Sequence, residues 1–72
     1  METLVIKDEK EIPDVLRNIR NKKGLTLMEL ATILGLKSPS TISLYETGQR
    51  KITFERFLII SKICGYDNIR LS

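Results

Sequence analysis

The residues best suited to chemistry in this chain are short hydroxylated side chains near its centre. Ser40, Thr41 and Ser43 fall close together, with Leu44 beside them, in the segment 39–47. A small polar face of this kind buries poorly, but it can approach another molecule closely. Hydroxyl groups exchange hydrogen bonds with base edges and phosphates, and an apolar side chain contacts a thymine methyl group. These residues are therefore suited to the groove of a DNA duplex.

Basic residues flank the hydroxylated segment on both sides. Lys37 precedes it, and Arg50 and Lys51 follow it where a helix over 39–47 would end. Lysine and arginine contact phosphate oxygens, which supplies affinity without reading base sequence. The segment holds no Arg, Asn or Gln for strong bidentate base contacts, and Gln49 lies beyond it. We therefore expect DNA shape and water to contribute to specificity.

The distribution of charge is compatible with a polyanionic partner. The 72 residues carry a net charge of +3, but the segment through Glu11 holds four acids and only two bases. The remaining residues hold ten bases against five acids, a net charge of +5. A solvated surface with ordinary lysines would show the same balance, so charge alone leaves both interpretations open.

Composition argues against an enzyme and against a metal site. The chain has no histidine, and its single cysteine, Cys64, has no partner for an internal disulfide, which fits a reducing, cytoplasmic setting. It has no glycine-rich phosphate loop and no convincing pair of carboxylates. We therefore expect no catalysis, no metal and no cofactor, and no small-molecule ligand is evident. No apolar run is long enough to span a bilayer, so no membrane partner is expected.

Two short helices joined by a tight turn would position the hydroxylated face. Thr26 and Glu29 have the spacing of a capping box, in which each side chain accepts a hydrogen bond from the other residue's backbone N–H. Gly35 ends this first helix of the pair. Its buried face has apolar residues at i, i+3, i+4 and i+7, namely Leu27, Leu30, Ala31 and Leu34.

The second helix of the pair has its own start and stop signals. Ser38 is a good N-cap, and Pro39 fits the first helical position, where its missing N–H is not needed. Ile42 and Tyr45 are three residues apart and would face the first helix, and Gly48 ends the second. The hydroxylated residues then point away from the pair.

Two further helices would enclose this pair. One begins near Ile12 or Pro13 and ends at Gly24, and its buried face contains Ile12, Val15, Leu16 and Ile19. The other begins after the cap residue Thr53 and runs to about Cys64. We expect its core-facing residues to be Phe54, Phe57, Leu58 and Ser61, with Ile60 and Cys64 near the edge of that face.

The order of these features resembles the lambda-repressor-like helix-turn-helix family, which includes phage repressors and xenobiotic-response-element regulators. The resemblance covers roughly residues 12–66 and is specific as a set. Its pieces are Leu16-Arg17-Asn18-Ile19-Arg20, Gly24-Leu25-Thr26, Glu29-Leu30-Ala31, Leu34-Gly35, Thr41-Ile42-Ser43 and Tyr45-Glu46-Thr47-Gly48-Gln49-Arg50. It implies an all-α, compact four- to five-helix DNA-binding domain over residues 12–66.

The resemblance also implies roles for individual residues. Arg20 and Glu46 match an arginine and a glutamate that form a buried ion pair in this family, a role that we favour over a phosphate contact by Arg20. The family usually has a phosphate-binding glutamine directly after the first cap. This chain has Leu27 there, so only its backbone N–H remains for that contact. The turn before Ser38 also looks one residue longer than usual, which shifts the register of base contacts.

The terminal segments lie outside this helical core. Residues 1–11 are interpreted as an arm or short strand and residues 67–72 as a tail or short strand. The two would join in a short terminal β-ribbon, unless residues 2–7 pair with a second copy of the chain. Ile59 and Ile63 form a small apolar patch that either binds a second copy or is covered by the terminal segments. The candidate dimer contacts are Leu4, Ile6, Ile59, Ile63, Ile69 and Leu71.

Together these features predict a sequence-specific regulator of transcription, acting as a repressor, with the helix over 39–47 in the major groove of double-stranded DNA. A homodimer would favour an inverted-repeat operator. The alternatives are an antitoxin or a protein-interaction module of the same fold. The candidate DNA contacts are Thr26, Leu27, Lys37, Ser38, Pro39, Ser40, Thr41, Ser43, Leu44, Gln49, Arg50 and Lys51.

Overall fold

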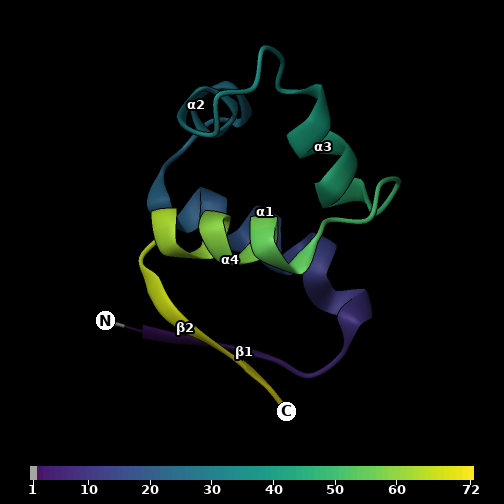
Figure 1. Cartoon of the computed structure of the whole chain (residues 1–72), viewed down its shortest axis with the longest axis vertical. Coiled ribbons are helices and arrows are strands. Elements are labelled where there is room, and N and C mark those ends of the chain that lie inside the picture. The colour runs from purple at the N-terminus through teal and green to yellow at the C-terminus, as the bar shows by residue number, and fades with distance from the viewer. Residues whose placement is uncertain (1) are drawn as a thin grey trace.

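Four α-helices and one two-stranded sheet make up the structure, a computed structural model that describes residues 2–72 (Figure 1). The family resemblance implied an all-α domain. The fold is not purely all-α, because the two ends of the chain pair as a small sheet. In chain order the elements are β1 (Glu2–Ile6), a 3-10 turn η1 (Glu9–Glu11), α1 (Ile12–Lys23), α2 (Leu27–Ile33), α3 (Ser40–Thr47), α4 (Phe54–Ile63) and β2 (Tyr66–Leu71).

Local capping chemistry fixes where α2 and α4 begin. The Oγ1 atom of Thr26 accepts from the N–H of Glu29 at 3.0 Å, and Glu29 Oε1 accepts from the N–H of Thr26 at 2.8 Å. The expected capping box is therefore confirmed. Thr53 caps α4, because its hydroxyl oxygen accepts from the N–H of Arg56 at 3.2 Å. Each cap satisfies backbone donors that the first helical turn leaves without partners.

The start of α3 differs slightly from the expected one. The helix begins at Ser40, and Pro39 stands in the cap position with helical dihedral angles of φ −73° and ψ −9°. Ser38 still serves this helix end, because its Oγ atom accepts from the N–H of Ser40 at 3.1 Å. At the other end Gly48 takes φ +78°, and the N–H of Gln49 bonds to the carbonyl of Leu44 at 3.0 Å. The left-handed glycine ends α3 as expected.

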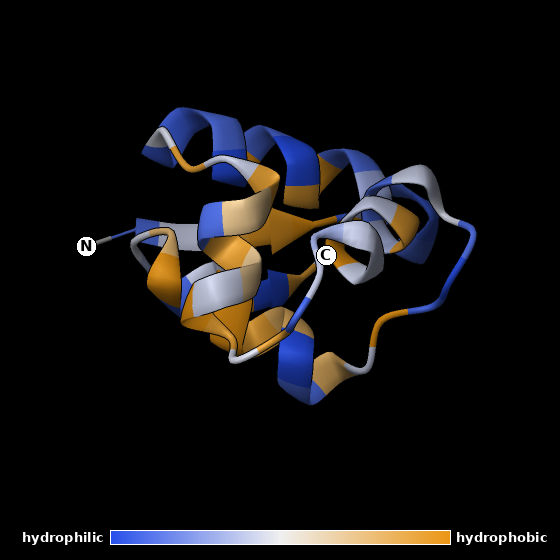
Figure 2. Cartoon of the chain, turned by 90° about the horizontal axis from the view of Figure 1, so that it is seen from above, coloured by the Kyte–Doolittle hydropathy of each residue, from blue (hydrophilic) through white to orange (hydrophobic). Residues whose placement is uncertain are grey.

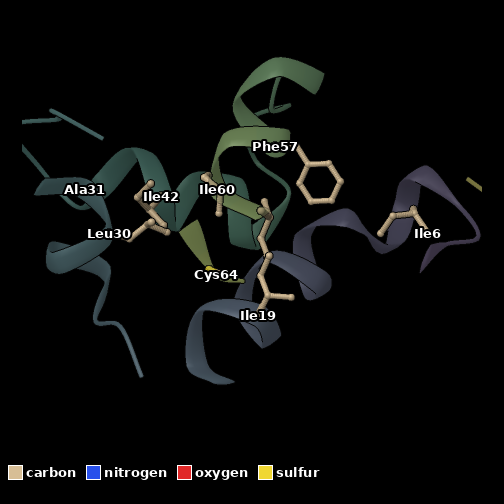
Figure 3. Close-up of a cluster of buried hydrophobic side chains, with 9 residues drawn as sticks. Ile6, Ile19, Leu30, Ala31, Ile42, Phe57, Ile60 and Cys64 are labelled. Atoms are coloured by element: carbon tan, nitrogen blue, oxygen red, sulfur yellow. The ribbon is translucent and has the colours of Figure 1, made fainter. Parts of the chain in front are cut away.

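The core lies where the four helices and β1 meet (Figure 3). Figure 2 shows apolar, orange segments in the middle of the molecule and on several helices, while the helix along its upper edge is mostly hydrophilic. Among residues 2–72, every buried side-chain nitrogen or oxygen has a hydrogen-bond partner. None of the described helices is both long enough and apolar enough to cross a membrane. The buried apolar residues are Ile6, Leu16, Ile19, Leu30, Ala31, Ile42, Phe57, Ile60 and Cys64.

The buried face of α4 is rotated from the expected one. Ile60 and Cys64 are in the core rather than at its edge, whereas Phe54 is 60% exposed. The buried face follows i, i+3, i+4 and i+7 from Phe57. Phe54 lies one turn before Phe57, at the first position of the helix, and is left outside the core. Ser61 fits inside because its hydroxyl donates to the carbonyl of Phe57 at 2.8 Å.

The two terminal strands form a parallel pair, which confirms the expected ribbon within one chain. Leu4 pairs with Ile69, and Ile6 with Leu71. The N–H of Ser72 extends the pairing by donating to the carbonyl of Ile6 at 2.8 Å. Parallel strands require a long crossover, and here all four helices provide it (Figure 1). The inward face of the ribbon closes the core beneath α4.

Candidate nucleic-acid interface

Helices α2 and α3 form a packed pair across a short connection, residues 34–39. Leu30 and Ala31 on α2 and Ile42 on α3 are fully buried in the shared core. Gly35 takes φ +75°, which lets the N–H of Leu36 reach the carbonyl of Ala31 at 2.8 Å. This glycine-dependent termination turns the chain toward α3.

One side of α3 is buried and the other faces away from the molecule. Ile42 and Glu46 lie inside, while Ser40 is exposed and Ser43 is half-exposed. Neither serine is in the interior. The remaining candidates on this helix, Thr41 and Leu44, are also half-exposed.

Thr47 is an exposed residue that sequence reasoning did not select. It follows Ser40 and Leu44 at the i, i+4, i+7 spacing of one helical face, which was the available signal. Its hydroxyl donates to the carbonyl of Leu44 at 3.3 Å. At the start of the same face, the hydroxyl of Ser38 donates to Ser40 Oγ at 3.0 Å. Two hydroxyl groups at this face, those of Ser38 and Thr47, therefore have internal hydrogen-bond acceptors.

A buried ion pair joins α3 to α1. Arg20 Nε lies 2.7 Å from Glu46 Oε2, and its Nη2 donates to Glu46 Oε1 at 3.0 Å. The remaining guanidinium nitrogen, Nη1, donates to the carbonyl of Leu25 at 2.8 Å. The hydrogen bond to Glu46 raises the pKa of Arg20, so the charged form is held. With its side chain 11% exposed, Arg20 has little surface left for a phosphate.

Arg17 adds a weaker contact to the same carboxylate. Its Nε lies 3.6 Å from Glu46 Oε1, and Nη2 donates to the carbonyl of Glu46 at 3.5 Å. The side chain of Arg17 is 48% exposed, so it remains accessible to solvent or to an anion. The local sequence gave Arg17 no distinct signal, because its contact depends on how α1 crosses α3.

The flanking bases lie on the surface. Lys37, Arg50 and Lys51 are exposed, as is Gln49. Lys51 is already paired, because its Nζ lies 2.9 Å from Glu9 Oε1, which raises the pKa of Lys51. Arg50 also borders a polar groove of about 430 Å³ between α3 and α4, where it is joined by the half-buried Arg56, a second base that sequence reasoning did not select.

The two candidate residues at the start of α2 differ in exposure. Thr26 is exposed, with its hydroxyl engaged in the capping box, while Leu27 is half-buried and packs against the core. The Leu27 side chain therefore supports the fold, whereas the Met28 side chain beside it is 50% exposed.

The candidate dimer contacts differ in how far the chain itself buries them. Ile6 is buried in the core of its own chain and is not available to a partner, which corrects its place among them. Leu4, Ile63 and Ile69 are half-buried against the same core. Ile59 and Leu71 are exposed. The terminal ribbon thus covers part of the apolar surface that the sequence left unassigned.

A family model described as helix-turn-helix matches residues 16–67. The matched region runs from the first half of α1 through all of α4 and includes the α2–α3 pair. No curated protein and no solved structure matches the chain significantly. The segment before residue 16, which contains β1 and η1, lies outside the match.

Proposed function

Because the chain belongs to the lambda-repressor-like helix-turn-helix family, a family of DNA-binding regulators, we propose that it is a sequence-specific repressor of transcription. In this proposal α3 enters the major groove of double-stranded DNA. The observation that carries it is the outward face of α3, with its small hydroxylated side chains, held in place by the Arg20–Glu46 pair behind it.

Base contacts come from the exposed side of α3. Ser40 and Leu44 lie nearest the base edges, with Thr47 further along the same face and Ser43 and Thr41 on its two borders. Hydroxyl groups bond to either purines or pyrimidines, so direct discrimination is moderate. Bound water and the deformability of the operator supply the rest of the specificity.

Most of the affinity is electrostatic. Lys37 and Arg50 contact phosphates on either side of the groove, and the backbone N–H of Leu27, which the capping box does not use, binds a further phosphate. Each neutralised phosphate releases counterions, so binding weakens steeply as salt is raised. Lys51 contributes once it leaves Glu9.

We infer that two copies bind an inverted repeat as a homodimer, with half-sites about one helical turn apart. The exposed Ile59 on α4 supports this inference, because it is a large apolar side chain that lies about one helical turn from Glu55, Arg56 and Lys62. Repression follows from occupation of the operator, which excludes other proteins from the same DNA in the cytoplasm.

Selection of bound sequences from a random duplex pool, at stated salt, tests the proposal directly. We expect a recurring sequence to be enriched. Leu44→Ala should then lower affinity for that sequence by about tenfold and leave affinity for random DNA nearly unchanged. Arg50→Ala should weaken both equally and reduce the salt slope by about 1.

The matched control is Val5→Ala, an equally simple truncation on the outward side of β1, far from α3 (Figure 1). It should change neither affinity. If no sequence is enriched, or if Leu44→Ala weakens binding to selected and random duplexes alike, the assignment of α3 to base reading is wrong.

A further inference from the structure

The segment between β1 and α1 carries an acidic residue to the base-rich loop that follows α3. This segment lies outside the residues matched by the family model. Its turn is fixed locally, because Asp8 Oδ1 accepts from the N–H of Lys10 at 2.9 Å and the carbonyl of Asp8 accepts from the N–H of Glu11 at 2.9 Å. Glu9 lies within this fixed turn and projects from it.

The start of α1 and the end of α3 are close neighbours. A Cβ atom added to Gly48 would lie 3.6 Å from Pro13 Cγ, so the two helix ends lie close together. Glu9 and Lys51 border the two neighbouring grooves on this side of the molecule. The pairing of Glu9 Oε1 with Lys51 Nζ at 2.9 Å therefore follows from the packing of the helices.

We propose that Glu9 is an internal competitor of DNA, whose carboxylate occupies the Lys51 ammonium group that a backbone phosphate would otherwise bind. This proposal rests on the proposed function. Each time a duplex uses Lys51, the ammonium group exchanges one anion, the carboxylate of Glu9, for another, a phosphate. Glu9 thereby lowers affinity for every duplex, including random DNA, and limits how long the protein stays on sequences that it does not recognise.

The exposure of the pair determines the size of the effect. The side chains are 83% exposed for Lys51 and 67% exposed for Glu9, so water screens their attraction and the exchange is easy. The hydrogen bond to Glu9 raises the pKa of Lys51, so the ammonium remains charged in both states. The competition is therefore expected to change affinity by a small factor and to leave the fold unaffected.

Binding of a labelled random-sequence duplex, followed by fluorescence anisotropy at low ionic strength, tests this competition. Glu9→Gln removes the carboxylate charge while keeping the shape of the side chain. Glu11→Gln is the matched control, because it makes the same change of net charge within the same turn, and Glu11 forms no ion pair within residues 2–72. We expect Glu9→Gln to raise affinity roughly two- to fivefold more than Glu11→Gln does.

Combination with Lys51→Met separates competition from general charge. In a chain that carries Lys51→Met, Glu9→Gln should raise affinity no more than Glu11→Gln does, because the contested cation is gone. Circular dichroism spectra of all variants should match that of the unmodified chain.

The outcomes separate this proposal from the function on which it rests. Equal gains from Glu9→Gln and Glu11→Gln, in a chain that binds duplex DNA, overturn the competition and leave the DNA-binding function standing. A gain from Glu9→Gln that persists in full with Lys51→Met also overturns it. Absence of any duplex binding by the unmodified chain at low ionic strength overturns both.

Discussion

Glu46 is a buried carboxylate that contacts two arginines of α1 with very different exposure. Arg20 is enclosed and bidentate, whereas Arg17 is about half-exposed and makes longer contacts.

Removing Arg20 leaves a buried charge without its partner, so Arg20→Ala should lower the free energy of unfolding by about 3–5 kcal/mol. Removing Arg17 leaves that pair intact, so Arg17→Ala should cost less than about 1 kcal/mol. Urea unfolding followed by circular dichroism measures both. Similar losses for the two variants would contradict this division of roles.

Glu29 gives the stability of α2 a dependence on pH. Its hydrogen bonds with Thr26, chiefly the one from the Thr26 backbone N–H, lower the pKa of Glu29. The folded chain therefore binds a proton at this site less readily than the unfolded chain does. The resulting stability is present above the ordinary glutamate pKa and is lost as pH falls through the lowered value.

A Glu29→Gln variant should show less of this acid sensitivity. The difference in unfolding free energy between the unmodified chain and Glu29→Gln should shrink between neutral pH and about pH 3.5. Urea unfolding at the two pH values measures it, and the other carboxylates cancel because both proteins contain them. If the difference in unfolding free energy stayed constant with pH, Glu29 would not be a source of the acid sensitivity.

Residue contacts were predictable from the sequence only where they are local or belong to the family pattern. The bonds between Thr26 and Glu29 follow from a spacing of three residues. The Arg20–Glu46 pair came from the resemblance, since nothing nearby in the sequence joins the two. The Glu9–Lys51 pair had no signal, because it arises where two helix ends meet.

At the scale of elements, β1 contributes to the core through one side chain in particular. Ile6 is 2% exposed, while its neighbour Val5 points outward and is 45% exposed. Ile6→Ala should therefore lower the free energy of unfolding by about 2–4 kcal/mol, because it leaves a cavity. Val5→Ala should cost well under about 1 kcal/mol. Thermal or urea unfolding of both variants provides the comparison, and a small loss for both would show that the strand is not packed in solution.

The bounds of the helices were more predictable than the face each one buries. Thr53 and Gly48 act within one turn of their own helix, so the sequence indicated them directly. The buried face of α4 packs partly against β2, which comes from the far end of the chain, so local periodicity does not show this contact. Phe57 was predicted to lie in the core and does so, whereas Ile60 replaces Phe54, which is exposed at the first position of the helix.

At the scale of the whole molecule, the proposed assembly of two copies on DNA can be tested by mutation. If Ile59 contributes to a contact between two copies, Ile59→Gln should reduce cooperative binding to the inverted repeat about tenfold or more, with little change on an isolated half-site. Val5→Gln is the control, since Val5 is similarly exposed on a different surface. Titrations of both duplexes, with sedimentation velocity at micromolar protein, measure this. Unchanged cooperativity in Ile59→Gln would place the contact elsewhere.

The parallel pairing of β1 with β2 has a consequence for how copies of this chain behave when warmed. Each strand has only the other as its hydrogen-bonding partner, so local opening of the sheet leaves both strands unpaired. The opening also exposes Ile6 and a strand edge whose backbone groups lack hydrogen-bond partners. Another copy that opens in the same way presents an identical edge. Reciprocal exchange of strands between neighbours would then restore every lost hydrogen bond, so swapped species should accumulate on heating before the helices melt.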